Sequence, residues 1–256
     1  MKLSDNTILI TGGATGIGLA FAKKFVELGN KVIITGRRQD KLDDAVKAVP
    51  GLVAIRADVA DPKGVAELAK KVIAEHPALN VLMNNAGVMV YRNLGVDAGD
   101  LASLTSELDI NLAGPIRMNA AFMAHLKSKR GAIINVSSGL AFVPLQAAPI
   151  YCATKAALHS YTISLRQQLA GSGVEVIELA PPAVKTELAD IPDTEGITII
   201  TTDVLIDATI KALRAGEEEI RVGQSNQLHW MSRIAPGFIN GQLAKGSAGL
   251  VPAKNA

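Results

Sequence analysis

Cysteine, net charge and long apolar runs are all scarce in this sequence of 256 residues, and each absence excludes a class of protein. A single cysteine, Cys152, cannot form a disulfide within the chain, which favours a reducing compartment. Lysine and arginine together number 26 and aspartate and glutamate 24, so the formal net charge is +2, with both signs interspersed. This balance gives neither a basic stripe for nucleic acid nor a polybasic patch for a membrane surface. We therefore expect a small-molecule partner, no nucleic acid and no membrane.

Targeting and metal-binding signals are missing as well. The amino terminus lacks the zones of a signal peptide, and no apolar run reaches the roughly 18 residues of a membrane span. We therefore expect a cytoplasmic location. The histidines are scattered, and no histidine or cysteine cluster has the spacing of metal ligands, so we predict no metal site. These histidines are His76, His125, His159 and His229.

Apolar residues are plentiful: they make up 48% of the chain, enough for one large core. Short apolar runs alternate with segments of helical periodicity. Strands are predicted at residues 7–10, 31–35, 52–55, 81–83, 132–136, 174–179 and 219–222, and helices at 19–28, 40–49, 62–75, 101–129, 151–170 and 203–215. This alternation predicts βαβ units with right-handed crossovers. The expected fold is a single α/β domain over residues 1–256: a doubly wound, mostly parallel seven-stranded sheet (a Rossmann fold) with helices on both faces.

The segment from Thr7 to Gly18 runs from an apolar strand through a glycine-rich turn into a helix. Glycines let the backbone approach an anion closely, and the first helical turn aims free N–H groups at that anion. Three residues separate Gly12 from Gly16 and one separates Gly16 from Gly18, which departs from the G-x-G-x-x-G fingerprint. The turn predicts a phosphate site, and a glycine-rich turn without a ligand is the alternative.

Tyr151 and Lys155 lie four residues apart in a predicted helix, so their side chains share one face. An ammonium beside a phenol favours the phenolate, which would bring the tyrosine closer to proton transfer at neutral pH. Ser138 and Asn85 follow predicted strands, at the sheet edge where ligands of open α/β sheets bind. The alternative for an isolated Tyr-x-x-x-Lys is a pair on the surface.

Taken together, these motifs resemble the short-chain dehydrogenase/reductase family, in its compact single-domain branch, from Leu3 to about Gly223. They are Thr11-Gly12-x-x-x-Gly16-Ile17-Gly18, Asn84-Asn85-Ala86-Gly87, Asn111, Ser138, Tyr151-x-x-x-Lys155 and the segment Pro181 to Thr186. The resemblance implies that Tyr151 exchanges the proton, Ser138 orients the substrate carbonyl, Lys155 lowers the pKa of the tyrosine and holds the nicotinamide ribose, and Asn111 supports a proton relay. Ser138 is preferred to Ser137 because the family's serine precedes its tyrosine by thirteen positions.

The resemblance also implies a set of residues that bind NADP(H). They are Gly12, Thr15, Gly16, Ile17, Gly18, Arg37, Arg38, Asp58, Val59, Asn85, Ala86, Gly87, Tyr151, Lys155, Pro181, Val184 and Thr186. One position departs from the family pattern: Pro182 stands where glycine is usual, which removes a backbone donor near the nicotinamide.

A preference for NADPH follows from the end of the second strand. NAD-dependent enzymes place an acidic residue there, about twenty residues past the glycine turn, to accept from the ribose 2′-hydroxyl. Here that position is Gly36, followed by Arg37 and Arg38, which suit a 2′-phosphate. The alternative is that both arginines belong to a solvated loop.

We expect an NADP(H)-dependent carbonyl reductase or alcohol dehydrogenase. The alternative is a binding protein of the same fold, a sensor or scaffold without catalysis. A nucleotide-sugar epimerase or dehydratase is a third hypothesis, but such enzymes generally have a longer carboxyl-terminal domain.

Apolar residues recur on more than one face of the segments 108–123 and 153–163, which predicts a homodimer or homotetramer. A substrate lid is expected at about 182–202 and a substrate helix-loop at about 224–242, both apolar. They favour hydrophobic ketones or aldehydes, although Arg233 leaves a carboxylate substrate open, and ordinary core or oligomer contacts are the alternative.

Overall fold

Short apolar runs form strands and the amphipathic segments between them form helices in the computed structural model, which describes residues 1–96, 100–186 and 197–251. The strands are β1 (Thr7–Thr11), β2 (Lys31–Gly36), β3 (Val53–Arg56), β4 (Leu79–Asn84), β5 (Ala132–Val136), β6 (Glu175–Ala180) and β7 (Glu219–Arg221). The helices are α1 (Gly16–Glu27), α2 (Gln39–Ala48), α3 (Pro62–Glu75), α4 (Leu101–Leu108), α5 (Gly114–Lys129), α6 (Pro149–Gln168), α7 (Thr202–Arg214), α8 (Gln224–Ile234) and α9 (Pro236–Gly246).

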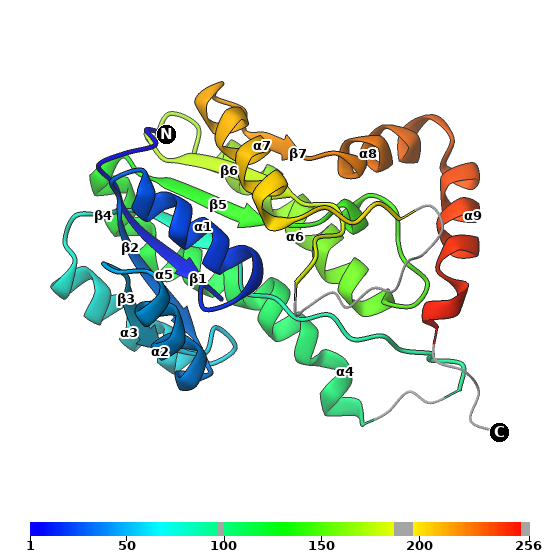
Figure 1. The fold of residues 1–256 in the computed structure, drawn as a ribbon, viewed down its shortest axis with the longest axis horizontal. Coiled ribbons are helices and arrows are strands. Elements are labelled where there is room, and N and C mark those ends of the chain that lie inside the picture. The colour runs from blue at the N-terminus through cyan, green and yellow to red at the C-terminus, as the bar shows by residue number, and fades with distance from the viewer. Residues whose placement is uncertain (97–99, 187–196, 252–256) are drawn as a thin grey trace.

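The described strands form one parallel sheet in the order β3-β2-β1-β4-β5-β6-β7 (Figure 1). Every residue of β1 is buried, as a central parallel strand requires, and Ile8 pairs with Val32 of β2 on one side and Val81 of β4 on the other. Strand order reverses between β1 and β4, which opens a crevice at their carboxyl ends. The predicted fold class is confirmed.

Helices cover both faces of the sheet. Residues of α1, α2 and α7 share one apolar cluster with it, in which the rings of Phe21 and Phe25 stack with centroids 5.8 Å apart. Residues of α3, α5 and α6 form a second cluster on the other face, around Phe122 and Leu126. Both phenylalanines of α1 and Phe122 are at most 1% exposed, and truncating such a side chain to alanine typically costs about 3–5 kcal/mol of stability. A third cluster joins α6 to α8 and α9 near the sheet's carboxyl edge.

The segment 101–129, predicted as one helix, is interrupted. A π-helical stretch, Asp109–Ala113, separates α4 from α5. Its wider turn accommodates Asn111, whose side chain is fully buried and is held by three hydrogen bonds. The side-chain Nδ2 donates to Val88 O and Thr154 Oγ1, and Oδ1 accepts from Val88 N. The regular α-helix is therefore interrupted where the Asn111 side chain turns toward the carboxyl edge of the sheet.

The two segments expected to contact substrate differ from the prediction in part. Residues 224–242 fall on two helices, because Ala235, which precedes Pro236, adopts φ −142° and ψ 62° and ends α8. Residues 187–196 of the expected lid, with Leu188, Ile191 and Pro192, lie outside the described residues. The ends of the lid are tied by a bridge between Val184 and Ile200. Among the helices that the structure describes, none is long and apolar enough to cross a membrane.

Candidate active site

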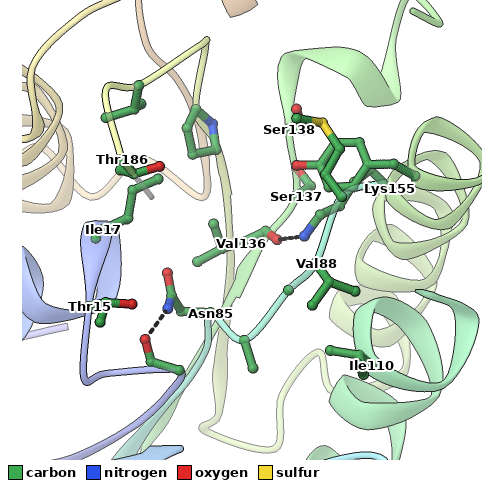
Figure 2. A pocket seen from close by; sticks show the side chains of 18 of the residues that line it. Thr15, Ile17, Asn85, Val88, Ile110, Val136, Ser137, Ser138, Lys155 and Thr186 are labelled. Atoms are coloured by element: carbon green, nitrogen blue, oxygen red, sulfur yellow. Dashed lines mark hydrogen bonds between the residues drawn. The ribbon is translucent and has the colours of Figure 1, made fainter. Parts of the chain in front are cut away.

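A cavity of about 530 Å³ lies along the carboxyl ends of the central strands. It begins at the glycine turn after β1, passes the ends of β2 and β4, and reaches the start of α6 and the segment 181–186. Figure 2 shows Thr15, Ile17 and Thr186 on one side of this cavity and Ser138 and Lys155 on the other, with Asn85 and Val136 between them. The cavity thus joins the two motifs that the sequence places more than a hundred residues apart.

The glycine turn has the backbone that its sequence predicts. Gly12 and Gly16 have φ of +64° and +54°, values that residues with a Cβ rarely adopt. A Cβ on Gly12 would lie 2.8 Å from Ala86 Cα, and one on Gly18 would lie 2.3 Å from the carbonyl oxygen of Gly12. Thr15, at the N-cap of α1, makes no side-chain cap hydrogen bond, so the N–H groups of the first helical turn remain for a ligand.

The segment after β4 fixes this turn. Asn85 Nδ2 donates to the carbonyls of Thr11 and Gly12, both at 3.0 Å, while Thr11 Oγ1 accepts from the N–H groups of Asn85 and Ala86. The neighbouring Asn84 points into the sheet, where its Nδ2 donates to the amide oxygens of Asn119 and Asn135. Two adjacent asparagines therefore serve two purposes: one braces the interior and one shapes the floor of the cavity.

Tyr151, Ser138 and Lys155 meet at the far end of the cavity. The hydroxyls of Tyr151 and Ser138 are hydrogen-bonded, and Ser138 Oγ accepts from Leu140 N at 3.1 Å. Lys155 Nζ donates to Val136 O at 2.8 Å (Figure 2). The same nitrogen lies 5.6 Å from the centre of the Tyr151 ring. The tyrosine and the lysine come from the first turns of α6, which starts two residues before Tyr151, at Pro149.

Burial governs the ionisation of this pair. It raises the pKa of Tyr151 to about 12, against the opposing effect of the Ser138 hydrogen bond. It also lowers the pKa of Lys155 to about 8, against the opposing charge of Glu178. The resemblance implies a tyrosine whose pKa is lowered by lysine, whereas in this structure the net shift of the Tyr151 pKa is upward, because the phenol is buried. The phenol is therefore protonated at neutral pH.

The other end of the cavity is cationic. Arg37, Arg38 and Lys41 line it beside Gly36, and Arg56 Nε donates to the carbonyl of Arg37 at 3.2 Å. Asp58 is the one carboxylate among the described lining residues, and its Oδ1 accepts from Ala60 N at 2.9 Å. No acidic side chain stands at the end of β2, where the sequence has Thr35, Gly36 and Arg37.

All but two of the predicted site residues line this cavity. Gly18 lies behind the turn, against Gly12 and Asn85, so it permits close packing and does not itself face the ligand space. Asn111 holds both backbone polar groups of Val88, and it is Val88 that lines the cavity. The choice between the two serines also has a geometric reason here, because Ser137 Oγ donates to Glu178 while Ser138 reaches Tyr151.

Comparison with known proteins agrees with this arrangement. The family model described as "short chain dehydrogenase" matches residues 6–195. The chain belongs to the short-chain dehydrogenase family.

Three relatives illustrate this membership. An uncharacterized oxidoreductase of Bacillus subtilis, DltE, is 42% identical over 224 residues, which are 86% of this chain and 89% of that protein. The NADPH-dependent 1-acyldihydroxyacetone phosphate reductase of Schizosaccharomyces pombe is 36% identical over 191 residues, 74% of this chain and 63% of that protein. A short chain dehydrogenase from Burkholderia cenocepacia, solved in complex with NADP, superposes with a TM-score of 0.83 at 28% identity, covering 95% of this chain and 99% of that chain.

Sequence reasoning missed several lining residues of this short-chain dehydrogenase. Lys41 adds a third cation beside the two arginines, and its position in the first turn of the helix that follows them was a usable signal. The other missed residues are mainly apolar and come from separate elements, so nothing in their spacing marks them. They include Met89, Leu140, Leu145 and Leu243, whereas the lining residues Ile197 and Leu228 fall within the two segments that were expected to contact substrate.

Proposed function

We propose that this short-chain dehydrogenase is an NADP(H)-dependent oxidoreductase that interconverts carbonyls and secondary alcohols, with a preference for hydrophobic ketones or aldehydes. The observation that carries the proposal is the meeting of Ser138, Tyr151 and Lys155 at one end of a cavity whose other end holds a glycine turn and three cations.

The residues present fit an NADP(H) cofactor. Gly12 and Gly16, both at positive φ, line the cavity beside the N–H groups that begin α1, where a pyrophosphate would lie. Arg37, Arg38 and Lys41 would hold a 2′-phosphate, and no carboxylate at the end of β2 opposes it. The Burkholderia relative solved with NADP and the NADPH-dependent yeast relative support this choice. When bound, the nicotinamide supplies or accepts the hydride.

The chain's own groups would handle the proton. Tyr151 is protonated at neutral pH, and its Oη would donate to the oxygen of a carbonyl that also accepts from Ser138 Oγ. Lys155, charged below about pH 8, lies over the face of the phenol ring and would stabilise the phenolate that remains. A positioned acid of this kind contributes about 10²–10⁴-fold to a rate.

The walls beyond Tyr151 point to an apolar substrate. Leucine, isoleucine and methionine side chains dominate this part of the cavity, and Gln224 contributes an amide whose Oε1 accepts from Thr198 N. Arg233, the one cation that left a carboxylate substrate open, does not line the cavity; its guanidinium donates to the carbonyl of His229 at 2.9 Å. A keto acid would therefore bring a charge against a wall in which, among the described residues beyond Tyr151 and Lys155, no cation stands to pair it.

The test compares substrates of matched size with NADPH, followed at the nicotinamide absorbance. An alkyl or aryl ketone should be reduced with a kcat/KM at least about tenfold above that of a keto acid of equal length, since an unpaired buried charge costs more than about 1.4 kcal/mol. A preference for the keto acid contradicts the apolar wall. NADPH binding without turnover on any carbonyl would instead favour the non-catalytic sensor.

A further inference from the structure

Glu178, on β6, is a carboxylate that the proposed reaction does not use. It is 2% exposed, yet both of its oxygens have partners. Ser137 Oγ donates to Oε1 at 2.5 Å, and His159 Nδ1 lies 2.7 Å from Oε2. A charge so deeply buried is costly unless it is paired, so these two contacts explain how the fold tolerates it.

The two partners belong to the two halves of the active site. Ser137 lies between Val136, whose carbonyl accepts from Lys155 Nζ, and Ser138, which reaches Tyr151. His159 lies one helical turn beyond Lys155 on α6, on the same face of the helix. The carboxylate therefore ties the end of β5, which carries the serine, to the helix that carries the tyrosine and the lysine.

Glu178 also supplies charge. Lys155 is 4% exposed and its Nζ donates to a neutral carbonyl, that of Val136. Burial lowers the pKa of Lys155, and the negative charge of Glu178 opposes this shift. A buried ammonium is more easily kept charged when a negative charge lies nearby.

We propose that Glu178 is a positioning residue of the active site: through Ser137 and His159 it sets the spacing between Ser138 and Tyr151, and its negative charge is the counter-charge of Lys155. This rests on the proposed function, because it assigns Glu178 a role in the same proton transfer.

Other titratable groups surround this cluster and bear on its pH dependence. The ring of Phe142 lies edge-on between His159, at 5.1 Å, and His229 of α8, at 4.8 Å. On the β7 side, Glu219 pairs with Arg166 and Arg221. Burial, together with the charges of Arg221, Arg233 and His159, lowers the pKa of His229, against the opposing charge of Glu219. These groups are common to the wild type and to a variant at Glu178, so a difference between the two pH profiles belongs to the substituted carboxylate.

The experiment measures kcat/KM for ketone reduction from pH 6 to 10 in the wild type and in Glu178→Gln, which keeps the shape and removes the charge. Glu175→Gln is the matched control, since Glu175 lies on the same strand but is exposed, where it pairs with the chain's amino terminus. We expect Glu178→Gln to move the alkaline limb of the pH profile about one unit lower, so that kcat/KM falls about fivefold at pH 8, approaches a loss of about tenfold at pH 10 and changes by no more than about twofold at pH 6. The control should keep the wild-type limb.

If kcat/KM falls by the same factor at every pH, Glu178 has only a structural role and is not the counter-charge of Lys155. Unchanged kcat/KM at all pH values would overturn the whole proposal. If Glu178→Gln does not fold, as judged by circular dichroism, Glu178→Asp replaces it. The shorter side chain keeps the charge but cannot reach both Ser137 and His159. We therefore expect kcat to fall at all pH values while the alkaline limb of the pH profile stays where it is in the wild type. A shift of that limb would contradict the assignment.

A second readout needs no turnover. Acetylation of Lys155 by acetic anhydride, followed by peptide mass spectrometry against pH, reports how much of the lysine is uncharged. The half-point should lie about one unit lower in Glu178→Gln than in the wild type. An unmoved half-point overturns the counter-charge even if the enzyme is active, and a wild type that reduces no carbonyl refutes the proposed function while leaving this measurement intact.

Discussion

Gly36→Asp should convert the cofactor preference from NADPH to NADH. Gly36 ends β2, and a Cβ built there meets only ordinary contacts: Leu42 Cδ2 at 3.7 Å and Ala14 Cβ at 3.8 Å. Its φ lies outside the left-handed region that would strain a side chain. The aspartate can therefore be introduced without moving the backbone, and it restores the acid that accepts from a ribose 2′-hydroxyl.

The magnitude follows from the charges. Two unit charges about 4 Å apart near a protein surface interact with about 4 kcal/mol before salt screening, and the neighbouring cations offset part of this. A net loss of about 2 kcal/mol for NADPH corresponds to roughly 30-fold in kcat/KM, and hydrogen bonding of the 2′-hydroxyl should improve NADH by about tenfold. Together the NADPH/NADH ratio should fall by a factor of about 300.

The assay determines kcat/KM for both cofactors at one ionic strength with a saturating ketone. Gly36→Asn is the matched control, because it has the same shape without the charge. If Gly36→Asn weakens NADPH as much as Gly36→Asp does, the effect is steric and the electrostatic reasoning is refuted.

Three further predictions concern the same site and the assembly. Tyr151→Phe should lower kcat by at least about 10²-fold while the dissociation constant of NADPH, measured by fluorescence, changes less than about threefold; substantial residual turnover would contradict the assignment of the acid. The rate of ketone reduction should be level from about pH 6 to 7.5 and should fall as pH rises through about 8. The reason is that Lys155, with its pKa lowered to about 8, is charged below that pH and neutral above it. A rate that rises across this range would contradict the role of the charged lysine. Leu108 and Ile116 remain 39% and 38% exposed, so light scattering at micromolar concentration should give the mass of two or four chains, and a monomer would refute the expected oligomer.

The sheet could be predicted because its strands are buried on both faces. Continuous apolar runs such as Ile8–Ile10 and Val32–Ile34 are typical of strands in the interior of a parallel sheet, and the helices between them favour right-handed crossovers. The glycine turn could be predicted for a related reason, since the left-handed backbone at Gly12 and Gly16 excludes most other residues.

Other features depend on contacts that spacing does not encode. The π-helical stretch around Asn111 arises from three hydrogen bonds to Val88 and Thr154, which are 23 and 43 residues away in sequence. The pairing of Glu178 with His159 needs β6 and α6 to be packed before it can be recognised, and within β6 the glutamate reads as one polar residue of an otherwise apolar strand. The upward shift of the pKa of Tyr151 is likewise a consequence of burial, which the sequence leaves undetermined.

The bridge between Val184 and Ile200 has a consequence for how this enzyme can diversify. Lys185 N donates to Ile200 O and Ile200 N donates to Ala183 O, so these two points of the backbone are held side by side. The entropy of loop closure grows slowly with loop length, by about 0.6 kcal/mol for each doubling, so a change in the number of residues between two fixed points should cost little stability. Thr186 and the strand ends keep their places as long as the bridge is intact. We therefore expect that sequence changes between these two points leave the positions of Ser138, Tyr151 and Lys155 unaltered.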